Sequence, residues 1–101
     1  MTVAAFRKLA LSFPGSEEIP HFERTSFRVN KKIFATLSEK DELVCLMLSV
    51  EDQFSFCQFD KSVIYPVPNK WGLKGATYVD LKKVKKDVMM DALRLAYNHK
   101  T

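Results

Sequence analysis

The sequence has few of the residues from which catalytic and metal sites are usually built. It contains two histidines and two cysteines in 101 residues, and none of them forms a close-spaced ligand cluster that would predict a zinc site. It also lacks the phosphate-loop and dinucleotide-binding glycine patterns and the nucleophile elbow G-x-S-x-G. We therefore expect no enzyme, no metal and no cofactor. An enzyme of unfamiliar mechanism is the alternative that composition leaves open.

Long apolar runs are missing as well. The apolar stretch Leu43–Leu48 is far shorter than the roughly 18 residues that a membrane-spanning helix needs. The segment Met1–Lys8 lacks the long apolar centre of a signal peptide. Cys45 and Cys57 lie within apolar patterns and not in a C-x-x-C pair, so we expect buried, reduced thiols without a disulfide. These features favour a cytoplasmic protein that does not associate with membranes.

The length and composition indicate one globular domain covering residues 1–101. Hydrophobic residues make up 47% of the chain and charged residues 28%, both ordinary values for a globular protein. A chain of this length can bury a core without disulfide or metal staples. There is no internal repeat or linker-like segment, and a monomer is favoured.

Helical periodicity occurs at both ends of the chain. Apolar residues recur at helical spacing from Val3 to Phe13, with Thr2 as the expected N-cap and Pro14-Gly15 as the stop. The closing helix carries a second stripe, made of Val84, Val88, Ala92 and Leu95 and broadened by Met89, Leu93 and Ala96. We expect the two helices to pack on one face of a sheet, with Phe6, Phe13, Val88 and Leu95 buried together.

The middle of the chain has the patterns of β-strands. Ser16–Pro20 is interpreted as an acidic connecting loop. Apolar and polar residues alternate in Thr25–Val29 and again in Ile33–Leu37, with Asn30-Lys31-Lys32 as a hairpin tip. Leu43–Leu48 is apolar on both faces, as in a central strand.

A short helix is expected to interrupt the strands. Ser49 can cap it, and one side would be lined by Val50, Phe54, Cys57 and Gln58. Val63–Tyr65 then resumes extended structure at a sheet edge, because prolines follow, and Thr77–Leu81 forms the last strand. The predicted fold is α+β, an antiparallel meander sheet flanked by N- and C-terminal helices on one face, with a short helix between strands.

The segment Trp71–Thr77 combines the only tryptophan with two of the three glycines. It follows a proline-containing loop, and its glycines allow a sharp turn or a close approach of backbone. Trp71 beside Lys70 and Lys74 forms a plausible contact surface. The alternative is that Trp71 plugs one end of the core while the glycines serve a loop.

Positive charge is concentrated in the second half of the chain. Residues 1–60 hold seven Lys/Arg against nine Asp/Glu, whereas residues 61–101 hold nine against three. A cluster of lysines at the start of the last helix opposes the helix dipole, which hints at a role outside local stability. The candidate nucleic-acid contacts are Lys31, Lys32, Lys70, Trp71, Lys74, Lys82, Lys83, Lys85 and Lys86. Lysines neutralise phosphates and aromatic rings stack on bases, but a solvated basic face is the alternative.

Four segments in order resemble the MmcQ/YjbR family of small bacterial proteins. They are Phe13–Glu18, Phe27–Leu37, Trp71–Thr77 and the closing helix. The resemblance implies a CyaY-like (frataxin-like) α+β fold and a suggested DNA-binding role.

The chain also departs from the family pattern. Ala76 stands where many relatives have a second tryptophan, which reduces any aromatic platform, and Lys85-Lys86 replace acidic residues at the start of the last helix. Frataxin-like iron binding is not carried over, because the first helix has Arg7 and Lys8 and no acid. The leading hypothesis is weak electrostatic binding of DNA or another polyanion without catalysis. The alternative is a protein- or small-ligand-interaction module centred on Trp71 and the Pro/Gly loop, with an unidentified protein as one possible partner.

Overall fold

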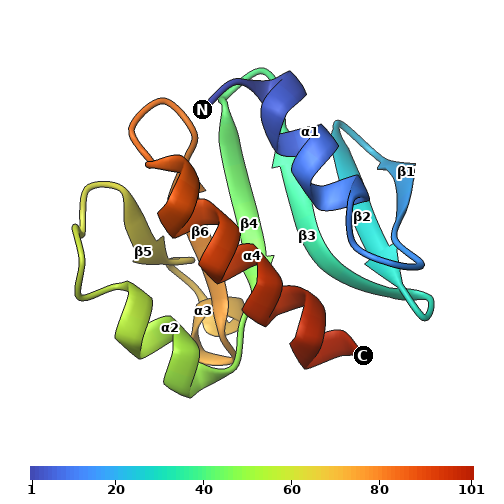
Figure 1. Ribbon diagram of the computed structural model, residues 1–101. Helices are drawn as coiled ribbons and strands as arrows, with labels where there is room; N and C mark the ends of the chain where they lie inside the picture. The colour runs from blue at the N-terminus through green and yellow to red at the C-terminus, as the bar shows by residue number, and fades with distance from the viewer.

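Six strands form one antiparallel sheet in the order β1-β2-β3-β4-β6-β5, accompanied by four helices (Figure 1). The computed structural model describes residues 1–101. Its elements are α1 (Val3–Leu11), β1 (Glu17–His21), β2 (Arg24–Val29), β3 (Lys32–Ser38), β4 (Leu43–Met47), α2 (Val50–Phe56), β5 (Ile64–Pro66), α3 (Lys70–Leu73), β6 (Ala76–Asp80) and α4 (Lys86–Lys100). The predicted α+β class is confirmed.

The first four strands form a meander, and the last two exchange places. The chain leaves β4, passes through α2 to β5 at the edge, and returns as β6 between β5 and β4. The predicted edge position of Val63–Tyr65 is therefore correct for β5. β4 lies inside the sheet with Val44, Cys45 and Leu46 all buried, which explains why that segment is apolar on both faces.

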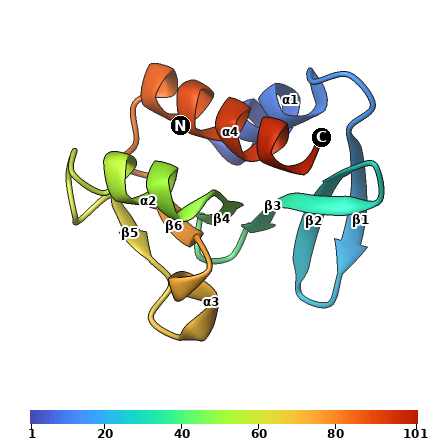
Figure 2. The same cartoon turned by 90° about the horizontal axis from the view of Figure 1, so that it is seen from below.

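The helices α1, α2 and α4 lie on one side of the sheet (Figure 2). Phe6 of α1 packs edge-on against Phe27 of β2, with ring centroids 5.5 Å apart, and both are fully buried. Phe13 stacks on Tyr97 of α4 at 4.8 Å. Core formation thus joins the two ends of the chain through the sheet.

The buried stripe of α4 is rotated from its predicted position. Its buried members are Met89, Ala92, Leu93 and Ala96. Of the four residues predicted to be buried together, Phe6 is fully buried, whereas Phe13, Val88 and Leu95 are only partly buried. Helical spacing defines a stripe about 100° wide, and which part of it meets the sheet depends on the tilt of the helix.

Local sequence signals act as expected at three places. The Thr2 hydroxyl accepts a hydrogen bond from the backbone N–H of Ala5 at 3.0 Å, and the Ser49 hydroxyl accepts one from Asp52 at 3.1 Å. Both are N-caps. Asn30 and Lys31 have φ values of 51° and 65°, the two consecutive positive values of a type I′ hairpin turn.

The interpretation of Ser16–Pro20 as a loop is wrong, because Glu17–His21 forms β1 and pairs with β2. An edge strand tolerates charge and proline, since one row of its backbone groups needs no partner. Glu18 also receives the guanidinium of Arg7 at 3.0 Å, which links α1 to this edge. Such an exposed ion pair adds little stability, so backbone pairing decides the conformation.

The outer edge of β5 offers no free hydrogen-bond donor. Val67 donates to Ala76, and Asp80 donates to Val63, so in this antiparallel pair Ile64 and Pro66 have their backbone groups turned outward. The Ile64 N–H is already bound to the carbonyl of Asp60 at 2.9 Å. Pro66 has no N–H.

No helix of the protein has both the length and the apolar composition needed to cross a membrane.

Candidate functional site

The helix-free face of the sheet forms a shallow concave surface. Paired residues across the sheet place one row of side chains on this face: Ile19, Ser26, Thr36, Cys45, Tyr78 and Tyr65. In Figure 2, α3 and the β1–β2 hairpin project from the sheet on the side opposite the helical layer. The strands between them become the floor of a groove.

This groove has a volume of about 290 Å³, near the lower end of the range of small-molecule sites. Asn69 and Trp71 line it from the α3 side, and His21 and Arg24 line it from the hairpin side. The floor between them is formed by Thr36, Cys45, Met47, Val67, Ala76 and Tyr78. The groove therefore combines an indole, a phenol, an imidazole and a guanidinium.

Trp71 is 60% exposed, so the alternative that it plugs the core is wrong. The segment is also not the expected loop, because Lys70–Leu73 makes one helical turn. Asn69 caps this turn by accepting the N–H of Trp71 at 2.8 Å. The turn lifts the indole out of the sheet and presents it to solvent.

The two glycines of the Trp71 segment are required by close backbone contacts. A Cβ at Gly72 would stand 1.8 Å from the carbonyl oxygen of Val67. A Cβ at Gly75 would stand 1.9 Å from the carbonyl oxygen of Leu48, and φ at Gly75 is +112°. Both values exclude any side chain without movement of the backbone, so α3 is tightly seated on its neighbours.

Gln53 of α2 fixes the position of α3 through side-chain hydrogen bonds. Its amide Nε2 donates to the carbonyl oxygens of Gly72 at 2.8 Å and of Ala76 at 3.0 Å, and the side chain is 8% exposed. Sequence reasoning missed this residue. In the sequence, Gln53 is one polar residue among charged and apolar neighbours in a short helix. This pattern is too common to predict a buried hydrogen-bonding role.

The indole separates the groove from a second cavity of about 170 Å³. Lys74, His99 and Lys100 line that cavity together with Trp71. The Lys74 ammonium lies 5.4 Å from the centroid of the indole, within the range of a cation–π contact. Lys74 does not line the groove, so the cation lies over the indole ring from outside the groove.

The hairpin side of the groove carries an unpartnered cation. Both ion pairs of the protein involve Arg7, and the partly buried Arg24 side chain has neither an ion pair nor a hydrogen bond to the protein. No carboxylate lines the groove. Burial raises the pKa of the Cys45 thiol on the floor, and the positive charge of Arg24 opposes this shift. Cys45 is therefore a neutral thiol near pH 7.

The nine residues predicted from sequence are all exposed, but they lie in three groups. Lys70, Trp71 and Lys74 come together on α3. Lys31 and Lys32 lie at the β2–β3 turn, at the same end of the sheet, because β3 and β6 are both antiparallel to β4. The remaining four follow β6 and so lie at the opposite end: Lys82, Lys83, Lys85 and Lys86.

The lysine group at the opposite end is stabilised by few local interactions. Lys85 occupies the N-cap of α4 and makes no capping hydrogen bond. Asp87 in the first turn offsets part of the unfavourable charge. Hydrogen bonds from Ser62 lower the pKa of Asp60, and the nearby Lys83 adds a smaller effect in the same direction.

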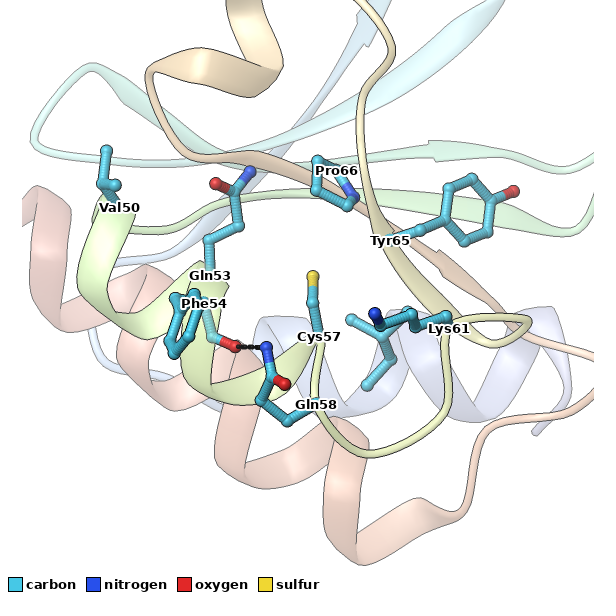
Figure 3. Close-up of a pocket in the computed structure, with 9 residues that line it drawn as sticks. Val50, Gln53, Phe54, Cys57, Gln58, Lys61, Tyr65 and Pro66 are labelled. Atoms are coloured by element: carbon cyan, nitrogen blue, oxygen red, sulfur yellow. Dashed lines mark hydrogen bonds between the residues drawn. The ribbon is translucent and has the colours of Figure 1, made fainter.

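A larger cavity of about 370 Å³ lies between α2 and β5 (Figure 3). The predicted side of α2 lines it, with Val50, Phe54, Cys57 and Gln58, and Gln58 donates to the Phe54 carbonyl at 3.0 Å. Burial raises the pKa of the Cys57 thiol, an effect that Lys61 opposes. The lining contains no carboxylate and no imidazole, so no base is available there to form a thiolate.

Both cysteines are free and buried, as predicted. No group of three or more His, Cys, Asp or Glu side chains is arranged to hold a metal ion.

Residues 11–99 match the sequence model of the YjbR family. The fold is similar to the crystal structure of a Deinococcus radiodurans protein with a DUF419 domain, with a TM-score of 0.79, 23% identity and coverage of 94% of this chain and 75% of that one. It is also similar to a Pseudomonas syringae protein solved as a structural-genomics target, with a TM-score of 0.74, 15% identity and full coverage of both chains. At these identities the similarity shows the fold alone. No curated protein matches the chain.

Proposed function

The chain belongs to the YjbR family, and from this starting point we propose that it binds nucleic acid weakly, mainly through electrostatic contacts, and catalyses no reaction. The observation that supports this proposal best is the group on α3. There an exposed indole stands between Lys70 and Lys74 on a turn fixed by Gln53. Exposed lysines neutralise phosphates, and an exposed aromatic ring stacks on bases of any sequence.

Salt dependence of binding tests the proposal. With three or four phosphate contacts to duplex DNA, the logarithm of the affinity should fall with the logarithm of salt concentration at a slope of about −3. We expect a variant with Lys82, Lys83, Lys85 and Lys86 changed to glutamine to bind more weakly to all sequences and to show a flatter slope. Fluorescence anisotropy of labelled DNA measures both quantities.

A control removes positive charge away from the candidate groups. Arg94 is exposed on α4 more than two helical turns beyond Lys86, and changing it to glutamine should leave the slope nearly unchanged. A second variant, Lys70→Gln with Lys74→Gln, reports on the α3 end. If the wild type shows no DNA binding at low salt, the proposal is wrong.

A protein-interaction module is the second candidate function, and exposed apolar side chains favour it. On α3, Trp71 is 60% exposed and Leu73 is 80% exposed. On the hairpin side, Phe22 is 97% exposed and packs edge-on against His21 of the groove, with ring centroids 5.0 Å apart. Exposed apolar side chains next to a groove are typical of contact surfaces. If the affinity for an anionic polymer does not depend on salt concentration, the contact is not mainly electrostatic, and this candidate is favoured over the first.

A further inference from the structure

We propose that the groove between α3 and the β1–β2 hairpin holds an unpaired base of a single-stranded nucleic acid, stacked on Trp71, with Arg24 as the partner of a phosphate. This inference rests on the proposed function. It adds a location for the contact and a preference for single strands over duplexes.

Stacking on Trp71 requires a base with a free face. In a duplex both faces of each base are covered by neighbours, and a base must be flipped out at a cost before a protein ring can reach it. A single strand presents its base faces with little rearrangement. The rings that line the groove are those of Trp71 at the wall, Tyr78 on the floor and His21 on the hairpin side.

The backbone that carries Trp71 is held in place before any ligand arrives. Gln53, Gly72 and Gly75 fix the α3 turn through hydrogen bonds and close backbone contacts. A turn that is already ordered loses less entropy on binding than a flexible loop. The Lys74 ammonium lies beside the indole outside the groove, where it can meet a phosphate of the same strand.

The charge of the groove fits a strand with phosphates. Arg24 is partly buried and has no protein partner for its guanidinium, which offers several donors in a planar fork that matches a phosphate. His21, paired with Arg24 across β1 and β2, lies next to it. Because no carboxylate lines the groove, a bound phosphate would meet no negative charge.

The single tryptophan makes the experiment direct, since fluorescence excited at wavelengths that the three tyrosines do not absorb reports on Trp71 alone. The probes are a short oligothymidylate, a hairpin duplex with the same number of phosphates, and an oligomer of the oligothymidylate's length that lacks bases. We expect saturable quenching with the oligothymidylate and little with the other two. The oligothymidylate should also bind more tightly than the baseless oligomer.

Variants locate the contact, with affinities measured by anisotropy of labelled oligothymidylate. Trp71→Ala should weaken binding by about 5- to 150-fold, Trp71→Phe should restore part of the loss, and Arg24→Gln should weaken binding by about tenfold or more. Leu73→Ala, which changes a neighbouring exposed residue outside the groove, is the matched control and should change little. Circular dichroism confirms that each variant is folded.

The outcomes separate the two proposals. Equal binding of oligothymidylate and the baseless oligomer, or an unchanged affinity of Trp71→Ala, would overturn the groove inference while salt-dependent DNA binding keeps the proposed function. Binding of no probe at low salt would overturn both.

Discussion

Lysines are clustered at both ends of β6, but the backbone that carries them differs. At its start, α3 holds Lys70 and Lys74 around Trp71, and the turn is fixed by a buried amide and two glycines with close backbone contacts. At its finish, four lysines occupy the connection to α4 and its first residue, where the N-cap makes no side-chain hydrogen bond. The lysines of the α3 end therefore lie on a turn fixed by specific contacts, whereas most of those at the other end lie on a loop without such contacts.

This difference shows that charge alone does not define a site. Lysines on a connection can lower the energy of any polyanion nearby through long-range attraction. Only the α3 end also supplies a ring in a fixed position, an adjoining groove and an unpaired arginine. Changes at the α3 end should therefore lower stability as well as binding, and changes at the other end should weaken binding without lowering stability.

The largest effect is expected from Gly75→Ala. The new Cβ would meet the Leu48 carbonyl oxygen, and φ is unfavourable for alanine, so we expect a loss of more than about 2 kcal/mol in the free energy of unfolding. Urea denaturation measures it. Gly15→Ala is the control: φ is +75° but the nearest atom is 4.0 Å away, which limits the loss to about 1–2 kcal/mol from the left-handed conformation. Equal losses at the two positions would contradict the close contact.

Gln53→Ala should have the next largest effect. It leaves the carbonyls of Gly72 and Ala76 without their side-chain donor, which should lower stability by about 1–3 kcal/mol and increase the mobility of Trp71 seen in fluorescence anisotropy. Gln58→Ala removes an exposed amide from the same region and should change stability by less than about 0.5 kcal/mol. An unchanged indole mobility in Gln53→Ala would show that the glycines fix α3 without help.

Much of the fold could be predicted from sequence because its signals are local. Thr2 and Ser49 cap helices through neighbouring backbone groups, Asn30 and Lys31 adopt the turn that their hairpin needs, and the apolar residues of Leu43–Leu48 require burial on both faces. β1 was missed because its stabilisation comes from pairing with β2. An exposed edge strand can be stabilised by backbone pairing without alternating apolar and polar residues, so its sequence carries no strand pattern.

The groove could be predicted only in part. Trp71 and its lysines are adjacent in sequence, so their grouping was visible. Arg24 and His21 line the groove because the β1–β2 hairpin projects from the same side of the sheet as α3, across the groove from it, and no sequence periodicity encodes that arrangement. The separation of the lysines into groups follows from strand direction, which sequence spacing does not reveal.

Removing the lysines at the finish of β6 should have a smaller and opposite effect on stability. In the variant with Lys82, Lys83, Lys85 and Lys86 changed to glutamine, unfavourable charge near the start of α4 is lost. We expect a stability that is unchanged or higher by about 0.3–1 kcal/mol, measured by urea denaturation at low salt. A clear loss of stability would mean that these side chains make stabilising native contacts, as the residues of the α3 end do.

The smallest effect should come from the buried thiols. Burial raises the pKa of Cys45 and of Cys57 in the folded chain, so unfolding releases thiols that ionise more readily. Their contribution to stability is complete below the ordinary thiol pKa and is lost as the pH rises through the raised values. Wild-type stability should thus decline in alkaline solution by more than that of Cys45→Ala, and native labelling of both thiols should be slower than in denaturant.

The proline at the outer strand β5 has a consequence for crowded solutions. Strands of separate molecules join into fibrils only when each edge supplies donors and acceptors in alternation. On β5 the one outward N–H is occupied by Asp60 and the next position is Pro66, so a second molecule would find carbonyls alone. This edge therefore ends the growth of the sheet on the β5 side, and strand addition between molecules would have to take place at β1, the other edge.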